Sequence, residues 1–291
     1  MRFRRRPACC RSRVGQELVS CPGPAHGLAV AGTALALSLM LLMLGCGQPE
    51  PAAGTAGPPA EAAAPTPFDH SLFDTILLAH VENGLVDYEA LKAQHSKQLE
   101  QYLRSLADAK GFAGRDEELA FWLNAYNAFV IKGVLEHYPG LESVMEVKGF
   151  FDDRRWRAAR KLHSLNEIEN EIIRPKFKDP RIHFILACAA QSCPPLQSRA
   201  MNPASLQSQL ESAARNAINS TKYVRVDPKA KVLRLTRVMS WYRKDFEENA
   251  GSLQAYVLKS IEDPAQSQLQ RADYTVQFMD YDWALNDAST R

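Results

Sequence analysis

Residues 119–128 read LAFWLNAYNA and form the centre of a long helical pattern. The aromatic side chains Trp122, Tyr126 and Phe129 are three or four positions apart, so they share one face of the helix. A face with this composition is typical of a helix that packs in a core. This stretch therefore predicts a helix whose aromatic side is buried.

The same helix carries two asparagines, Asn124 and Asn127, which are three positions apart on one face. Asparagine is a modest helix former, so two of them close together need a structural or functional reason. We expect their amides either to hydrogen-bond a neighbouring loop or to line a polar site. The same two alternatives apply to Trp241, Tyr242 and Asp245, of which Trp241 and Asp245 are four positions apart on one side of a helix.

Outward from this stretch, further helical patterns alternate with short β patterns. We expect helices over 68–83, 88–106, 116–137, 165–174, 203–219, 238–248 and 252–261. We expect hairpins over 150–162 and 223–235, a buried strand over 182–188 and a last strand over 274–278. The order is not that of βαβ units, so it favours the α+β class. We predict a mainly helical single domain with a small antiparallel sheet, compatible with a papain-like arrangement.

The first 46 residues have the organisation of a bacterial export signal. Six arginines precede an apolar run over 28–44, which is short for a bilayer-spanning helix of roughly 20 residues. The run ends in MLGC over 43–46, which is similar to a lipobox, where the cysteine is lipidated and becomes the first mature residue. We therefore expect 1–46 to be a lipoprotein signal peptide with Cys46 lipidated; the alternative is an uncleaved N-terminal anchor.

Residues 47–67 are rich in Pro, Ala and Gly, which predicts a linker between the lipid and a folded domain over 68–291. Gly47, rather than an aspartate, follows the lipidation position. This favours the outer membrane over the inner one. The expected location is the bacterial cell envelope, on a lipid anchor that faces the periplasm.

Charge is unevenly distributed along the chain. Residues 1–45 hold six of the 35 basic side chains and one of the 33 acidic ones, which leaves 29 basic and 32 acidic side chains in the rest. This remainder lacks the basic excess that neutralises phosphates, so no nucleic-acid partner is expected. The sequence contains no P-loop, GxGxxG, CxxC or HExxH motif, so we expect no cofactor and no metal. A basic run over 154–161 predicts a solvated hairpin face or, alternatively, a site for an anionic cell-wall polymer.

Several segments, taken in order, resemble the DUF547 family of domains of unknown function. They are VDY at 86–88, LAFWLNAYNA at 119–128, LNEIEN at 165–170, DPRIHF at 179–184, SCPPL at 192–196, WYRKDF at 241–246 and YDW at 281–283. The resemblance implies a domain type and no established activity. Asn170 stands where a His is frequent in the family, so no role of that His carries over, and Ala187 stands where a polar Asn is expected before Cys188.

Only Cys188 and Cys193 belong to the predicted folded domain. The other cysteines lie in the leader or at the lipidation position: Cys9, Cys10, Cys21 and Cys46. Two prolines follow Cys193 and stiffen its loop, and a stiff loop can aim a nucleophilic thiol. A thiol needs a base or a positive field to form thiolate, and His183 is the base nearest in sequence.

Asn124 and Glu169 are the residues expected to orient this His, as an Asn or an acid does in papain-like sites. Asn127 and Glu118 are further candidates for the same role. The sequence therefore predicts a catalytic group of Cys193, His183, Asn124 and Glu169.

Two other interpretations of the cysteines stay open. An exported protein meets an oxidising compartment, and a four-residue spacer allows a disulfide between Cys188 and Cys193. Alternatively, Cys188 continues the apolar face of 182–188 and is an inert core residue. On a strand, Cys188 and His183 would lie on opposite faces, which argues against a direct pair.

Two functions follow from these alternatives. The first is a cell-envelope lipoprotein that acts as a thiol-dependent hydrolase of the peptidase or amidase type through Cys193. The second is a non-catalytic envelope module that has a Cys188–Cys193 disulfide and binds an envelope protein or a glycan. The first predicts that iodoacetamide labels the native protein, whereas a disulfide blocks labelling until it is reduced.

Overall fold

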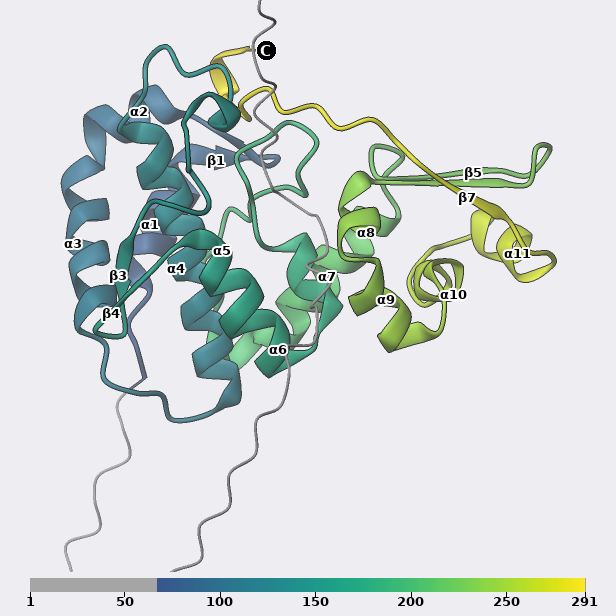
Figure 1. The fold of residues 1–291 in the computed structure, drawn as a ribbon, viewed down its shortest axis with the longest axis horizontal. Coiled ribbons are helices and arrows are strands. Elements are labelled where there is room, and N and C mark those ends of the chain that lie inside the picture. Colours follow the sequence, from purple (N-terminus) through teal and green to yellow (C-terminus); the bar gives the residue numbers. More distant parts are fainter. Residues whose placement is uncertain (1–66, 291) are drawn as a thin grey trace, which may run out of the picture. The chain divides into compact units, whose positions relative to one another are not determined.

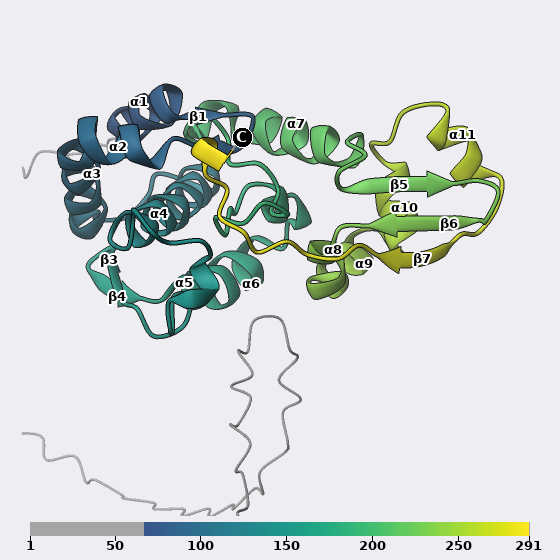
Figure 2. The same cartoon turned by 90° about the horizontal axis from the view of Figure 1, so that it is seen from above.

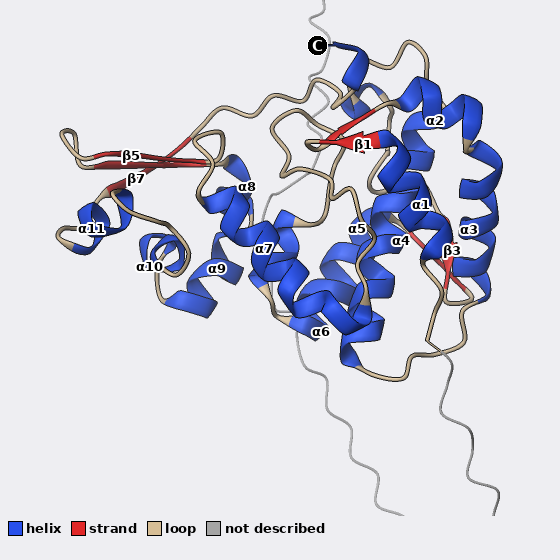
Figure 3. Ribbon diagram, turned by 180° about the vertical axis from the view of Figure 1, so that it is seen from behind, coloured by secondary structure: helices blue, strands red, loops and turns tan. Residues whose placement is uncertain are grey.

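The computed structural model describes residues 67–290 (Figure 1). The predicted signal peptide with Cys46 and almost all of the predicted linker lie outside these residues. The described part is mainly helical with short strands (Figure 3), which confirms the α+β class. The papain-like arrangement stays a prediction. Between residues 67 and 290, no helix has the length and apolarity needed to cross a bilayer.

The elements are numbered along the chain within each type, and helices, strands and turns alternate in sequence. The α-helices are α1 Ser71–His80, α2 Tyr88–Gln94, α3 Ser96–Asp108, α4 Arg115–Leu135, α5 Leu165–Glu167, α6 Arg174–Phe177, α7 Leu206–Ile218, α8 Arg237–Trp241, α9 Arg243–Ala250, α10 Leu253–Leu258 and α11 Ala265–Gln270. The strands are β1 Val81–Glu82, β2 Leu85–Val86, β3 Trp156–Ala158, β4 Lys161–His163, β5 Val224–Asp227, β6 Val232–Leu235 and β7 Thr275–Phe278. Tighter or wider turns are η1 Val144–Glu146, η2 Ile168–Ile173, η3 Pro180–Phe184, η4 Pro203–Ser205 and η5 Ala288–Thr290.

Helix α4 lies at the centre of the core, in contact with α3, α5, α7, η2 and η4. Trp122, Tyr126 and Phe129 are all buried, as their spacing predicts. The Phe129 ring stacks on that of Trp156 with 5.2 Å between the centroids, which fixes the β3–β4 hairpin against the helix.

The two asparagines of α4 hold neighbouring loops, which confirms the first of the two expectations. Asn124 Nδ2 donates to the Met201 carbonyl at 2.9 Å, and its Oδ1 accepts from the Met201 N–H at 2.8 Å. Asn127 Nδ2 donates to the Ile185 carbonyl at 3.1 Å, and its Oδ1 accepts from the Ala187 N–H at 3.0 Å. Each amide therefore serves a loop backbone as the next strand of a sheet would.

The buried strand predicted over 182–188 is wrong. The segment begins as the 3₁₀ turn η3 (Pro180–Phe184) and continues as irregular backbone. Asp179 Oδ1 accepts from the Arg181 N–H at 3.0 Å, and the proline at the first position suits a helical start. Asn127 then satisfies the buried backbone that follows, so this apolar run is buried without a sheet.

The helix predicted to end before Pro175 continues to Phe177. Its start is the predicted capping box, in which Ser164 Oγ accepts from the Glu167 N–H at 3.0 Å. The wide turn η2 (Ile168–Ile173) has π-helical hydrogen bonding and leads into α6. A wider turn relieves the crowding that a proline causes against the preceding carbonyl, which explains why the helix continues past it.

Two other helical predictions contain a break. The helix expected over 88–106 is divided into α2 and α3 at His95, and the helix expected over 238–248 is divided into α8 and α9 at Tyr242. The hairpin of β5 and β6 is antiparallel, as predicted. Strand β7 joins β6 in parallel, so this three-stranded sheet is mixed rather than purely antiparallel.

Residues 279–287, named here the C-terminal segment, run back from β7 toward β1 and β2 as an extended coil, yellow in Figure 2. The Val86 N–H donates to the Asn286 carbonyl at 2.9 Å, and the Asn286 N–H donates to the Ala189 carbonyl at 3.0 Å. The segment thus joins the first hairpin to the loop that holds the cysteines.

Candidate functional site

The cysteine loop, residues 185–195, is held from two sides although it has little regular structure. Asn127 binds its first residues from α4. From the other side, the C-terminal segment provides two carbonyl acceptors. The Gln191 N–H donates to the Ala284 carbonyl at 2.8 Å, and the Ser192 N–H donates to the Asp282 carbonyl at 3.1 Å. The loop therefore presents its two thiols from a fixed backbone.

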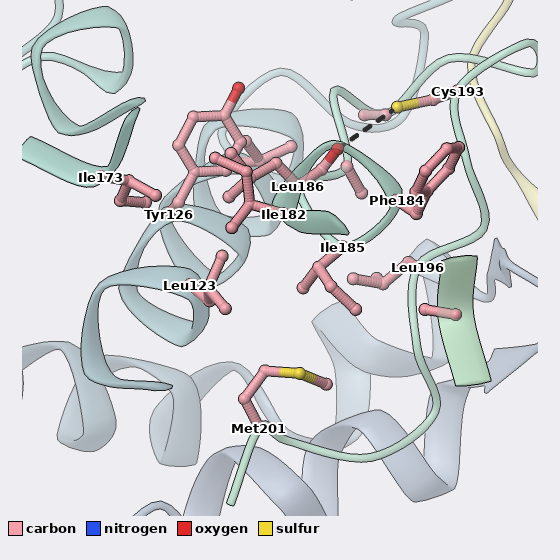
Figure 4. Close-up of a cluster of buried hydrophobic side chains, with 14 of the residues drawn as sticks. Leu123, Tyr126, Ile173, Ile182, Phe184, Ile185, Leu186, Cys193, Leu196 and Met201 are labelled. Carbon is pink, nitrogen blue, oxygen red and sulfur yellow. Dashed lines mark hydrogen bonds between the residues drawn. The ribbon is translucent and has the colours of Figure 1, made fainter. Parts of the chain in front are cut away.

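Cys188 is half-buried and Cys193 is buried, and both are free thiols in the described part of the chain. The predicted disulfide is therefore not formed in this structure. The Cys188 N–H donates to Cys193 Sγ at 3.0 Å, and Cys188 Sγ lies 2.9 Å from the Tyr281 hydroxyl. The Cys193 S–H can point to the Leu186 carbonyl, 3.6 Å from Sγ (Figure 4), or to the Cys188 sulfur.

These contacts make the two thiols unequal. The pKa of Cys188 is lowered, first by the hydrogen bond from Cys193 and further by the one from Tyr281, which together outweigh its burial. The pKa of Cys193 is raised well above its ordinary value, first by burial and then by the same hydrogen bond to Cys188. Cys188 is therefore the thiol that forms thiolate more readily, whereas the sequence favoured Cys193.

His183 lies between two carboxylates rather than beside a thiol. Its Nε2 is 2.8 Å from Asp245 Oδ2, and its Nδ1 is 3.8 Å from Glu169 Oε1. The ring is only 2% exposed and stacks on Tyr242 with 3.9 Å between the centroids. Among the described residues, Nδ1 has no hydrogen-bond partner. If Nε2 carries the proton that binds Asp245, Nδ1 is left as a buried acceptor that faces Glu169.

Asp245 binds both Arg174 and His183 and so connects the members of this polar group. Arg174 binds it in a bidentate manner, with Nε 2.7 Å from Oδ2 and NH2 2.8 Å from Oδ1. Burial alone would raise the pKa of Asp245, but the hydrogen bonds from Arg174 and His183 outweigh burial and lower that pKa. Asn170 Oδ1 accepts from Arg174 NH1 at 2.6 Å and so helps to orient the guanidinium.

The wide turn η2 places Glu169 and Asn170 on this group. Tyr242 is hydrogen-bonded to Glu169, and its pKa is raised, first by burial and then by the negative charge of Glu169. Burial followed by the same charge raises the pKa of Tyr126. Both hydroxyls therefore stay protonated as donors. Glu169 also acts electrostatically on Cys188, so the carboxylates and the thiols belong to one neighbourhood.

A group of aromatic rings borders the thiols. Tyr281 lies 4.7 Å from Trp241 and 4.7 Å from Trp283, measured between ring centroids, and all three side chains are half-buried. Tyr281 also contacts Cys188, so this aromatic group and the thiol share one residue.

The structure thus assembles part of the predicted catalytic group. His183 and Glu169 lie together, and Cys193 contacts Cys188, but neither nitrogen of His183 is hydrogen-bonded to a thiol in the described chain. Both amide atoms of Asn124 are used by Met201.

The sequence analysis missed two residues of the site, Arg174 and Tyr281. For Tyr242 and Asp245 it left open the same two alternatives as for the asparagines of α4, and the structure places both residues in the polar group around His183. Tyr281 lies in the YDW segment, which was singled out for the resemblance, and that was the available signal for it.

Two other predictions concern ligands. In residues 67–290, no group of three or more His, Cys, Asp or Glu side chains is arranged to hold a metal ion. In the basic run over 154–161, Arg154 pairs with Glu136 and lies over Trp156, and Arg155 pairs with Glu167. These two arginines are thus paired within the chain.

Residues 110–218 match the family model described as "Protein of unknown function, DUF547", which confirms the resemblance. The matched range contains both cysteines, His183 and Glu169, whereas Asp245 and Tyr281 lie beyond it. No curated protein and no solved structure matches the chain.

Proposed function

We propose that residues 110–218, which match the DUF547 family model, carry the nucleophile of a thiol-dependent hydrolase in the bacterial cell envelope. The nucleophile is Cys188 rather than Cys193, and the substrate bond is a peptide or amide bond. One observation carries the proposal: Cys188 is half-buried, and hydrogen bonds from Cys193 and Tyr281 lower its pKa. A thiolate at neutral pH is the species that attacks a carbonyl carbon.

The reaction has two steps. Cys188 Sγ bonds to the carbonyl carbon, the C–N bond breaks, and the amine leaves with a proton from a water molecule that the Tyr281 hydroxyl, 2.9 Å from the sulfur, helps to orient. The hydroxide left by this water attacks the thioester and releases the carboxylic acid and the Cys188 thiolate. His183, Asp245 and Arg174 are positioning residues that fix Glu169 and Tyr242 beside this centre.

The test is iodoacetamide labelling of the full-length native protein, with the site mapped by peptide mass spectrometry. We expect Cys188 to be alkylated first at neutral pH. Hydrolysis of a peptide-amide library should be lost at every pH in Cys188→Ser, whereas Cys193→Ser keeps the nucleophile and should retain hydrolysis, with its pH profile shifted upward. Faster labelling of Cys193, or hydrolysis that survives Cys188→Ser, would contradict the assignment.

A second candidate is a non-catalytic module that binds an envelope protein or a glycan. The half-buried rings of Trp241, Tyr281 and Trp283 favour it, because aromatic side chains are enriched in binding surfaces. This candidate predicts that Trp283→Ala weakens retention on envelope material and that no library peptide is cleaved.

We also propose that Cys46 is lipidated and anchors the protein to the outer membrane. Cys46→Ser should move the protein from the membrane fraction to the soluble fraction, measured by fractionation and immunoblotting. Cys21→Ser, in the expected leader, is the matched control and should leave the distribution unchanged. Retention of Cys46→Ser at the wild-type level would favour an uncleaved N-terminal anchor.

A further inference from the structure

The two thiols of the cysteine loop differ in exposure and in their neighbours. Cys188 is half-buried and contacts Tyr281 of the aromatic group, whereas Cys193 is 6% exposed. The Cys188 N–H donates to Cys193 Sγ at 3.0 Å, so the backbone of one cysteine holds the sulfur of the other.

We propose that Cys188 and Cys193 form a reversible redox couple, in which a hydroperoxide oxidises Cys188 and Cys193 resolves the product as an intramolecular disulfide. The couple itself needs no hydrolase activity. Its consequence, that oxidation switches the thiol centre off, rests on the proposed function.

The chemistry balances in two steps. The Cys188 sulfur takes the terminal hydroxyl group of the hydroperoxide, the O–O bond breaks, and the thiol proton leaves with the other oxygen as an alcohol or as water. The Cys193 sulfur then attacks the sulfenic sulfur, the S–O bond breaks, and the hydroxide leaves as water with the Cys193 proton. The two thiols supply the two electrons that reduce the hydroperoxide, and a dithiol reductant reverses the reaction.

The division of roles follows from position and access. A small oxidant can reach the half-buried thiol of Cys188 beside Tyr281. An oxidising protein that carries its own disulfide is larger, and it would have to displace the C-terminal segment that hydrogen-bonds the loop at Gln191 and Ser192. Cys193 is screened from the oxidant but hydrogen-bonded to Cys188, which is the position that a resolving thiol needs.

The fixed backbone also brings the two sulfurs together before oxidation. Asn127 binds the start of the cysteine loop, and the Asn286 N–H binds the carbonyl of Ala189, between the two cysteines. The loop therefore needs little reordering when the disulfide closes, and closure competes well with further oxidation of the sulfenic acid.

The experiment treats the reduced, full-length protein with tert-butyl hydroperoxide and follows it by intact and peptide mass spectrometry. We expect the wild type to lose two hydrogen atoms, with a Cys188–Cys193 linkage that dithiothreitol reverses. Cys193→Ala should instead gain one oxygen atom at Cys188 and react with dimedone. Cys188→Ala should show neither change in this loop.

Two outcomes would overturn the couple. One is first oxidation at Cys193, and the other is a wild type that keeps a dimedone-reactive Cys188 without forming the linkage. Near-ultraviolet circular dichroism checks that both variants are folded, and Cys193→Ser repeats the test if Cys193→Ala is not. These two outcomes can be distinguished from a failure of the proposed hydrolase function. In that case the disulfide would form and be reversed, but the reduced protein would cleave no peptide amide.

Discussion

The asparagines of α4 and the histidine of η3 are both buried polar groups, but they differ in how fully they are satisfied. Asn127 uses its donor and its acceptor on the backbone of one loop. His183 leaves Nδ1 without a hydrogen-bond partner in the described chain, 3.8 Å from Glu169. An unsatisfied buried group costs stability unless a water or a ligand completes it. The comparison separates a polar group whose hydrogen bonds are all used within the fold from one that keeps a position for a further partner.

The largest loss of stability is expected from Asn127, the residue whose hydrogen bonds are all used. Asn127→Ala leaves the Ile185 carbonyl and the Ala187 N–H buried without their partner. We expect the free energy of unfolding to fall by about 3 kcal/mol, measured by urea denaturation. Asn249→Ala, which removes an exposed amide that accepts from Lys259, is the control and should cost much less. Equal losses in the two variants would mean that the amide does not carry the cysteine loop.

A smaller effect, dependent on pH, is expected at Asp245. Its folded pKa is lowered, so it stabilises the fold fully above its unfolded pKa of about 3.9, and this contribution is lost as the pH falls further. Asp245→Asn should cost about 2 kcal/mol at neutral pH and less in acid, measured by thermal unfolding across pH.

The exposed pair of Asp227 and Arg234 provides the matched control, because Asp227→Asn should change the free energy of unfolding very little. If Asp245→Asn and Asp227→Asn lose the same stability at every pH, the Arg174–Asp245–His183 group contributes no more to folding than an exposed ion pair does.

The smallest effect concerns only the thiol. Cys193→Ala removes the main hydrogen bond that lowers the pKa of Cys188, so that pKa should rise toward its ordinary value of about 8.5. The measurement is the rate of iodoacetamide labelling of Cys188 against pH, whose midpoint should move upward. Tyr281→Phe removes the smaller contribution and should move the midpoint less. A larger shift in Tyr281→Phe would reverse the order of the two donors.

Much of the fold could be predicted from local patterns. The spacing of Trp122 and Phe129 predicted the core helix, and the pattern around Ser164 predicted the capping box. The segment over 182–188 could not be predicted in this way, because an apolar run is the same in a strand and in a buried loop. What distinguishes them is the polar partner, and Asn127 is more than fifty residues away in sequence.

The site was predictable only in part for the same reason. His183 and Glu169 were candidates by residue type, and the structure brings them together. The preference for Cys193 came from its prolines, whereas the inequality of the thiols comes from burial and from Tyr281, which is 93 residues from Cys188. Contacts over such distances leave no periodic signal in a single sequence.

The C-terminal segment determines when the cysteine loop can reach its final structure during synthesis. The cysteine loop finds partners in residues that follow it by 90 positions or more, so during synthesis it emerges from the ribosome well before they do. A chain cut just before Tyr281 would retain every residue of the matched family range, yet Cys188 would lose the Tyr281 hydroxyl, and the cysteine loop would lose the carbonyls that accept from Gln191 and Ser192. Trimming of the carboxyl end by a protease would thus abolish the site and leave the family signature intact.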